Sequence, residues 1–314
     1  MRTPFLIASL HPHCSHLEEV TDHPFVGGLR FNTIVPTTLS PGDVLQKLRD
    51  MCKDKPLWID VKGRQLRVLE YTDALYAAVR VSHRVQVETP ATVFFKDYQH
   101  PGRMMEANIT EVEGDRLILT RRPCRPLGKG EALNILDPSL VIEGYLTDQD
   151  RAYLEAAHEL GINAVMASFF EEWSDEQDIL AIHPKSCVMA KIESTRGMNF
   201  VYGLRRAKKY IPLMAALDDL YINQGPCILQ DLAAIRKRDP LAVAASRILT
   251  SLEQARDTSD VSFQDLLTVM GLWKMGYSTF MLSDGLCYDA ETFRMAMHVW
   301  EQITRDIDRL EKRS

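Results

Sequence analysis

The sequence predicts an α/β fold in which parallel strands alternate with helices, with a small antiparallel β domain inserted into it. The first observation behind this prediction is that helical segments end at glycines and lead into continuous apolar runs, which is typical of parallel strands buried on both faces. The second is that residues 79–137 contain segments in which apolar and polar residues alternate, as in antiparallel strands. The length of 314 residues suits one large α/β barrel or two modest domains.

Several helices are marked by clear starting signals. Residues 40–43 (SPGD) place a serine N-cap, a proline at the first helical position and an acid in the first turn. Residues 147–150 (TDQD) and 262–265 (SFQD) have the spacing of a capping box, with aspartate in place of glutamate. In the final segment, 290–310, apolar residues recur along one helical stripe. These signals predict helices after residues 40, 147 and 262, and a long last helix.

Apolar runs of strand length lie between the predicted helices. They cover residues 5–10, 56–61, 163–170, 187–193, 213–217, 241–246 and 277–283. Within the alternating stretch, a hairpin is predicted to turn at residues 113–115, where glycine allows a tight turn. We therefore expect the α/β domain to comprise 1–72 and 138–314, and a small inserted β-barrel domain to comprise 73–137.

Composition excludes several classes of protein. The net charge of -6 provides no basic face for phosphate backbones, so nucleic acid is not an expected partner. No apolar run approaches the roughly 18–20 residues that span a bilayer, and the N-terminus has too short an apolar core for a signal peptide. The six cysteines occur singly, without a CxxC pair, which argues against a disulfide framework or a structural zinc site. We expect a cytoplasmic enzyme with no membrane partner.

One predicted strand, 187–193 (CVMAKIE), carries two charges in an otherwise apolar run. Alternate side chains of a strand share a face, so Lys191 and Glu193 point the same way as Met189. An unpaired buried charge costs several kcal/mol. The two side chains should therefore face a polar mouth, a metal or each other. A site is favoured because barrels of this class place active sites at the carboxyl ends of their strands, but an internal Lys–Glu ion pair remains the alternative.

The same strand carries a resemblance to a known family. VMAKIESTRGMNFV (188–201) resembles the "KIE…G" strand of pyruvate kinase. Further segments resemble other motifs of that family, in the same order along the chain: 27–33, 58–67, 145–170, 210–222, 241–252 and 265–300. The resemblance implies a (β/α)8 TIM barrel of the phosphoenolpyruvate/pyruvate type with an inserted β domain. It ends near residue 310, so we expect a divergent, truncated pyruvate kinase-like chain that lacks the family's C-terminal domain.

The resemblance also implies a divalent-metal centre. Lys191 corresponds to the catalytic lysine of the family, which neutralises charge on the transferring phosphoryl group and near the enolate oxygen. Glu193 and Asp219 correspond to its two carboxylate ligands of Mg²⁺ or Mn²⁺, hard cations that prefer oxygen. From the sequence alone, Asp219 has a second interpretation as a helix N-cap.

Other positions correspond to substrate and cation ligands. Arg30 matches an arginine suited to phosphate, Ser246 a hydroxyl near the substrate, and Arg67 a further substrate-binding arginine. Asn32 and Asp60 match ligands of a monovalent cation, K⁺. Two alternatives stay open: Ser246 as an N-cap, and Arg67 as a solvated arginine on an edge.

The departures from the family pattern fall around this centre. At 217–221 (LDDLY) an aspartate replaces glycine where the family binds the substrate carboxylate, and a tyrosine adds bulk. At 32–35 (NTIV) and 60–63 (DVKG), a serine and a threonine of the K⁺ site and a histidine near the nucleotide phosphates are lost. The metal and lysine centre is thus kept, whereas the residues for K⁺ and for a nucleotide partner are eroded.

Three functional hypotheses follow. The first is phosphoryl transfer between phosphoenolpyruvate and a nucleotide, by an enzyme of pyruvate kinase type. The second is a metal-dependent aldolase or lyase that stabilises the enolate of a 2-oxo acid. The third is a non-catalytic binding or regulatory protein on the same fold. The first two predict a small-molecule substrate, whereas the third allows a different partner on an exposed flank of the barrel. A homo-oligomer is among the expected assemblies.

Overall fold

The computed structural model describes residues 4–70, 78–96, 104–120, 127–204 and 209–312. It divides into two compact units. The first comprises Met1–Val61 and Arg151–Ser314, and the second comprises Lys62–Asp150.

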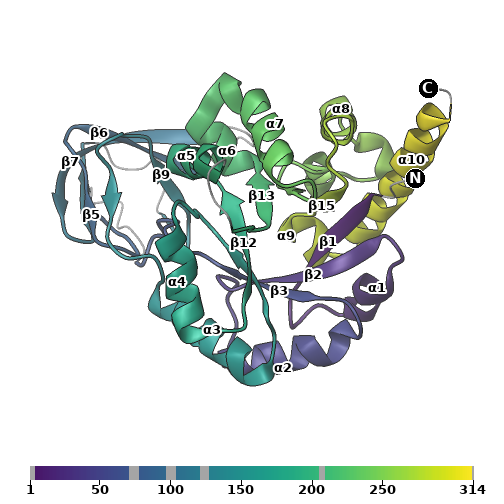
Figure 1. Ribbon diagram of the computed structural model, residues 1–314, viewed down its shortest axis with the longest axis horizontal. Helices are drawn as coiled ribbons and strands as arrows, with labels where there is room; N and C mark the ends of the chain where they lie inside the picture. Colours follow the sequence, from purple (N-terminus) through teal and green to yellow (C-terminus); the bar gives the residue numbers. More distant parts are fainter. Residues whose placement is uncertain (1–3, 71–77, 97–103, 121–126, 205–208, 313–314) are drawn as a thin grey trace. The chain divides into compact units, whose positions relative to one another are not determined.

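The first unit is a closed barrel of parallel strands with helices on the outside (Figure 1). The strand order around the barrel is β1-β15-β14-β13-β12-β11-β3-β2. Its strands are β1 (Phe5–Leu10), β2 (Val26–Asn32), β3 (Leu57–Val61), β11 (Ala164–Ala167), β12 (Cys187–Ile192), β13 (Leu213–Ala216), β14 (Val243–Ala245) and β15 (Thr279–Met281). This architecture confirms the predicted (β/α)8 TIM barrel. Of these strands, β2 had been recognised only through the family motif at 27–33, because its two glycines interrupt the apolar run.

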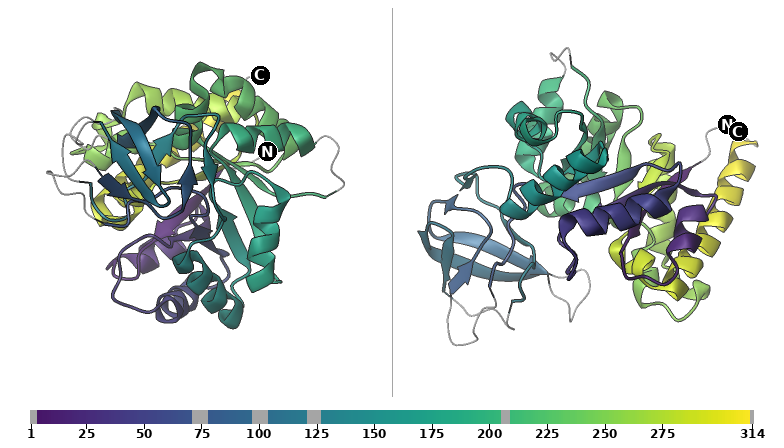
Figure 2. Two further views of the ribbon diagram at one scale, coloured as in Figure 1. Left: turned by 90° about the vertical axis from the view of Figure 1, so that its left-hand side faces the viewer. Right: turned by 90° about the horizontal axis from the view of Figure 1, so that it is seen from below.

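The helices of the chain follow the strands, and two views at right angles show them outside the barrel (Figure 2). They are α1 (Leu17–Asp22), α2 (Pro41–Cys52), α3 (Asp148–Leu160), α4 (Trp173–Ile182), α5 (Thr195–Gly203), α6 (Leu217–Gln224), α7 (Ile228–Arg238), α8 (Phe263–Lys274), α9 (Asp284–Tyr288) and α10 (Ala290–Glu311). Short 3₁₀ helices among the described residues include η2 (Gly225–Cys227), η3 (Thr250–Gln254) and η4 (Thr258–Asp260). No helix among the described residues is both long enough and apolar enough to cross a bilayer.

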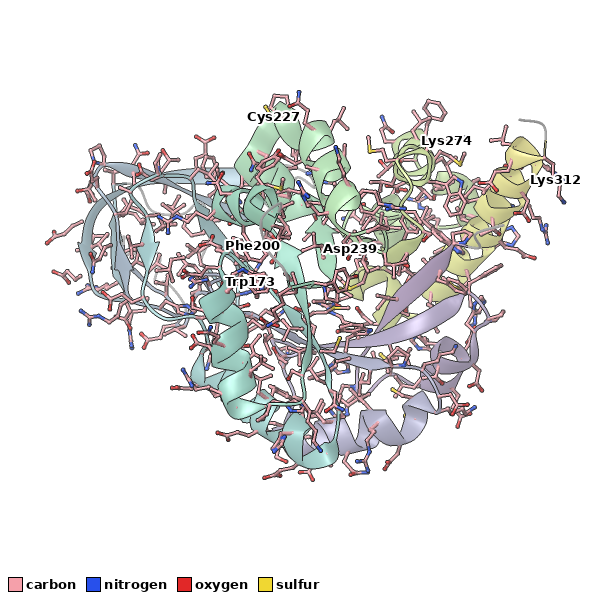
Figure 3. All side chains as sticks on the ribbon, in the orientation of Figure 1. Trp173, Phe200, Cys227, Asp239, Lys274 and Lys312 are labelled. Carbon is pink, nitrogen blue, oxygen red and sulfur yellow. The ribbon has the colours of Figure 1, made fainter. Side chains whose placement is uncertain are left out.

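The predicted helix starts are confirmed by capping hydrogen bonds. The Ser40 hydroxyl accepts from the Asp43 amide at the start of α2, and the Ser262 hydroxyl accepts from the Asp265 amide at the start of α8. On the outer layer, Trp173 of α4 and Phe200 of α5 lie side by side (Figure 3), with ring centroids 5.1 Å apart. Such edge-to-face packing fixes the two helices that flank β12.

Methionines fill much of the barrel interior. The inner cluster consists of Ile7, Met166, Met189, Met214, Val243, Ala245 and Met281, with Trp58 packed against it. Unbranched thioethers adapt to irregular spaces, which suits the interior of a barrel. Because Met189 belongs to this cluster and lies two residues before Lys191 on β12, strand alternation places Lys191 on the inward face as well.

The second unit is antiparallel. A five-stranded sheet has the order β4 (Ala78–Arg80), β8 (Arg116–Leu119), β7 (Met104–Glu113), β6 (Ala91–Lys96) and β9 (Leu133–Ile135). A second sheet pairs β10 (Val141–Ile142) with β5 (Val85–Gln86). The predicted hairpin is confirmed, since Glu113 pairs with Arg116 across Gly114, whose φ is 67°. Where we expected a small β-barrel, the described strands form these two sheets.

The second unit also extends beyond the expected range 73–137. Before that range, Val68 forms an antiparallel bridge with Val81, and Arg67 forms one with Ala132. After it, β10 pairs with β5. Backbone pairing therefore ties both flanking segments to the antiparallel unit, and a sequence pattern that marks only alternating runs does not include them.

Candidate active site at the carboxyl ends of the barrel strands

The functional candidates of the first unit lie where barrel strands end. Arg30 and Asn32 lie at the end of β2, Asp60 lies near the end of β3, and Lys191 lies near the end of β12. The strand register pairs Asn32 with Asp60. Parallel strands of a closed barrel share one rim at their carboxyl ends, which is where TIM barrels carry their sites. Residues from distant parts of the sequence are thereby brought to one place.

A fully buried carboxylate, Asp60, lies at the centre of this group. Its Oδ2 accepts a hydrogen bond from Arg30 Nε at 2.9 Å, and Arg30 Nη2 donates to the same oxygen. Its Oδ1 accepts from Lys191 Nζ at 3.1 Å and from the Ser168 hydroxyl at 3.1 Å. The Ser168 hydroxyl in turn accepts from Lys191 Nζ at 2.7 Å. Asp60 thus holds two cationic side chains in fixed positions.

Glu193 is held from two sides. Its Oε1 lies 3.4 Å from Lys191 Nζ, and its Oε2 accepts a hydrogen bond from the Phe169 amide at 2.6 Å. Phe169 has a φ of 48°, in the left-handed region that bulky residues rarely adopt. Backbone strain of this kind persists only where surrounding contacts impose it, and it gathers at functional sites. The turn at 168–169 directs both the Ser168 hydroxyl and the Phe169 amide at the centre.

The electrostatics keep the lysine charged. Burial by itself lowers the pKa of Lys191, but the charges of Asp60 and Glu193 outweigh it, so the pKa lies above its ordinary value. For Arg30, the carboxylates Asp284 and Asp60 likewise outweigh burial and raise the pKa. Both cations therefore stay protonated at neutral pH.

For Glu193, burial outweighs the neighbouring positive charge, so the pKa of its carboxyl lies above the ordinary value. Burial raises the pKa of this carboxyl, and the nearby carboxylates of Asp219 and Asp60 raise it further, against the lowering effects of Lys191 and of the Phe169 amide. Asp219 is the third residue of α6, which is capped by Ala216, so the structure does not use Asp219 as an N-cap. Its charge and that of Glu193 repel each other in the folded chain.

Glu193 and Asp219 suit one hard divalent cation. Magnesium is bound in many proteins by one or two carboxylates, with water and substrate oxygens completing its shell. Two mutually repelling carboxylates, one of them buried, match that donor set. In the described part of the chain, no group of three or more histidine, cysteine, aspartate or glutamate residues is arranged to hold a metal.

Asp284, which was not predicted from the sequence as a site residue, lies directly beside Arg30. Arg30 Nη1 donates to Asp284 Oδ1 and also to the Ser9 hydroxyl at 2.9 Å. Asn32 Nδ2 donates to Asp284 Oδ2 at 2.6 Å. The signal for Asp284 was an acid shortly after the strand 277–283, but nothing local links it to Arg30, 254 residues earlier.

A second missed residue is Arg247. Its Nε lies 2.6 Å from Asp218 Oδ1, and its guanidinium lies 4.8 Å from the centre of the Tyr221 ring. The two substitutions that distinguished 217–221 from the family pattern are thus joined by one arginine. Ser246, which precedes it, has a φ of 64° and does not cap a helix, because η3 begins only at Thr250.

Arg67 belongs to the second unit and is engaged there. Its Nη1 donates to the Gly130 carbonyl at 2.8 Å, and its Nη2 donates to the Gln65 side chain. The residue is half-buried rather than fully solvated. These contacts hold the guanidinium within the second unit.

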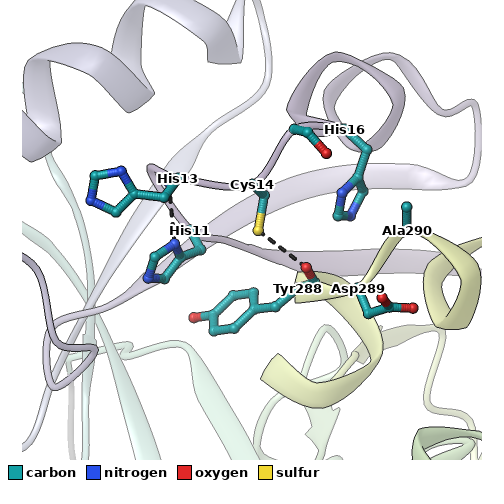
Figure 4. Close-up of a pocket in the computed structure, with 8 residues that line it drawn as sticks. His11, His13, Cys14, His16, Tyr288, Asp289 and Ala290 are labelled. Carbon is teal, nitrogen blue, oxygen red and sulfur yellow. Dashed lines mark hydrogen bonds between the residues drawn. The ribbon is translucent and has the colours of Figure 1, made fainter.

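A histidine-rich pocket of about 460 Å³ lies beside the end of β1 (Figure 4). It is lined by His11, His13, Cys14, Ser15, His16, Tyr288, Asp289 and Ala290. Cys14 Sγ donates to the Tyr288 carbonyl at 3.3 Å, and burial raises the pKa of this thiol. A thiol that stays protonated is a poor nucleophile and a poor metal ligand. The Cys14 thiol is therefore held protonated against the Tyr288 carbonyl.

Neither a protein-family model nor a curated protein matches the sequence. Among solved structures, the chain is similar to the crystal structure of Cryptosporidium parvum pyruvate kinase, with a TM-score of 0.75. The chain has the fold of pyruvate kinase. The sequence identity is 17% over 96% of this chain and 70% of that chain, so the pyruvate kinase likeness is one of fold, and the chemistry has to be argued from the residues.

Proposed function

We propose that the centre around Lys191 binds a small 2-oxo acid of the pyruvate class and stabilises its enolate with the help of Mg²⁺ or Mn²⁺. The observation that carries this proposal is Lys191, a residue only 6% exposed, whose ammonium is held between Asp60 and Glu193 at a strand's carboxyl end. A fixed positive charge in a site of low dielectric is suited to negative charge that develops on an oxygen.

The positive charge of the Lys191 ammonium determines its role in the reaction. When a solvent base takes a proton from the carbon next to a keto group, the electron pair of the broken C–H bond places negative charge on the keto oxygen, which then needs a positive partner. Because the pKa of Lys191 is raised, its ammonium acts as that partner and not as the base. Glu193 and Asp219 would hold the divalent cation, which supplies Lewis-acid polarisation of the keto group when bound. Asp60 and Ser168 keep the ammonium in place.

Phosphoryl transfer from phosphoenolpyruvate to a nucleotide is the second candidate, favoured by the pyruvate kinase fold. Two contacts weigh against it. The guanidinium of Arg30 is already engaged by Asp60 and Asp284. Asp60 also holds two cations of the protein itself, an arrangement that does not favour K⁺ at this carboxylate. Enolate chemistry without a phosphoryl group fits this arrangement better.

Two assays in solution distinguish the two candidate functions. Exchange of the methyl protons of pyruvate with deuterium, followed by NMR, is expected to require Mg²⁺ or Mn²⁺ and to stop on addition of a chelator. A coupled assay with phosphoenolpyruvate, ADP and Mg²⁺, run with and without K⁺, is expected to stay silent. Turnover in the coupled assay would favour phosphoryl transfer instead. Silence in both experiments would leave the hypothesis of a non-catalytic protein.

A further inference from the structure

The carboxylate of Asp284 occupies a ready-made anion site. One of its oxygens accepts from Arg30 Nη1, and the other accepts from Asn32 Nδ2 at 2.6 Å. Arg30 is also positioned by the Ser9 hydroxyl and by Asp60. A guanidinium and an amide that converge on one carboxylate form the donor set by which proteins bind carboxylates and phosphates. Here the occupant is the protein's own side chain.

The exposed fractions of the Arg30 and Asp284 side chains show which of the two a ligand meets first. The side chain of Arg30 is 8% exposed, whereas that of Asp284 is 30% exposed. The donor is therefore buried beneath its acceptor, and an anion that approaches from solvent meets a negative charge first. Asp284 begins α9 directly after Ser283, whose hydroxyl caps that helix, so its backbone is fixed at this position.

The charge balance supports the same conclusion. Arg30 already has a buried ion-pair partner in Asp60, which also pairs with Lys191. Asp284 adds a second carboxylate to Arg30, on the more exposed side of the guanidinium. Its effect is to make the rim beside Arg30 repel anions.

We propose that Asp284 is a specificity-determining residue that fills the anion site of Arg30 and Asn32 and so excludes phosphoryl groups from the centre. Without the Asp284 carboxylate, Arg30 and Asn32 donate instead to a tetrahedral oxyanion such as a phosphate monoester. The consequence for the substrate rests on the proposed function: the 2-oxo acid enters without a phosphoryl group at this position.

The test is the binding of inorganic phosphate to metal-free protein in the presence of a chelator, measured by calorimetry. An internal occupant lowers apparent affinity in proportion to the time for which the site is closed. We expect Asp284→Ala to bind phosphate about tenfold or more tightly than the wild type, as expected when a charge-assisted hydrogen bond no longer competes. Asp284→Asn, which keeps the side-chain size, is expected to show a smaller gain, and it decides the question if the alanine variant does not fold.

Two further variants make the result specific. Asp289→Asn removes one negative charge nearby and keeps an N-cap residue for α10, so it is expected to bind phosphate like the wild type. The double variant Arg30→Met with Asp284→Ala is expected to lose the gain. The proposal is overturned if folded Asp284 variants bind phosphate no more tightly than the wild type, or if the double variant keeps the gain. Because neither metal nor pyruvate is present, failure of the enolate proposal would appear in a different experiment.

Discussion

Lys191 Nζ donates to Asp60 Oδ1 at 3.1 Å, across 131 residues of sequence, and both side chains are buried. This contact joins β12 to β3, two strands that both pair with β11. Since Asp60 also holds Arg30, one carboxylate fixes two cations at the rim of the barrel. The predictions below follow from that arrangement and from the carboxylates around it.

Replacing Asp60 by asparagine is expected to destabilise the fold strongly. The change removes the carboxylate from two buried cations, and breaking a buried ion pair from one side costs about 3–5 kcal/mol. Urea unfolding followed by circular dichroism measures the difference. Glu19→Gln, which breaks the exposed pair with Arg294, is the matched control and is expected to cost about 1 kcal/mol or less. A cost for Asp60→Asn no larger than that of the control would contradict the central role of Asp60.

The raised pKa of Glu193 predicts a pH dependence of stability. The folded chain holds this proton more tightly than the unfolded chain does, so metal-free stability falls as the pH rises from the ordinary glutamate value through the folded-state pKa. Glu193→Gln removes the titrating group. Its stability relative to the wild type is therefore expected to increase over that pH window, as measured by unfolding at a series of pH values. A difference that stays constant with pH, or decreases, would show that the pKa of Glu193 is not raised.

Binding of a divalent cation is expected to depend on Asp219 and not on its neighbour. Mn²⁺ titrations followed by electron paramagnetic resonance should show weaker binding to Asp219→Asn, by about tenfold or more, because a carboxylate ligand is lost. Asp218→Asn removes the same charge one residue earlier, where the carboxylate pairs with Arg247, and is the matched control. Equal Mn²⁺ affinities of the two variants would argue against Asp219 as a ligand.

The sequence was sufficient for the parts of this account that depend on local pattern. Alternation along 187–193 predicted that Lys191 and Glu193 share a face with Met189, and capping signals predicted where α2 and α8 begin. The family resemblance then predicted the barrel and the inserted domain, as the pyruvate kinase fold confirms.

The rest depends on contacts between distant residues or on backbone geometry that no pattern displays. Asp60 was interpreted as a K⁺ ligand, yet its carboxylate contacts Lys191 and Arg30, because the register of four strands, β2, β3, β11 and β12, brings them together. The left-handed backbone at Phe169 has no signature in the sequence. The partners Asp284 and Arg247 were missed for the same reason, since each pairs with a residue far away along the chain.

The most direct test of the account is the rate of metal-dependent exchange of the pyruvate methyl protons in a Lys191→Met variant. Loss of one preorganised stabiliser of a developing oxyanion typically lowers the rate by about 10²–10³-fold, and a loss of that size is expected here. Lys185→Met, an exposed lysine just before the start of the same strand, is the matched control and is expected to exchange at the wild-type rate. If folded Lys191→Met exchanges as fast as the wild type and the control, Lys191 does not stabilise an enolate in this protein.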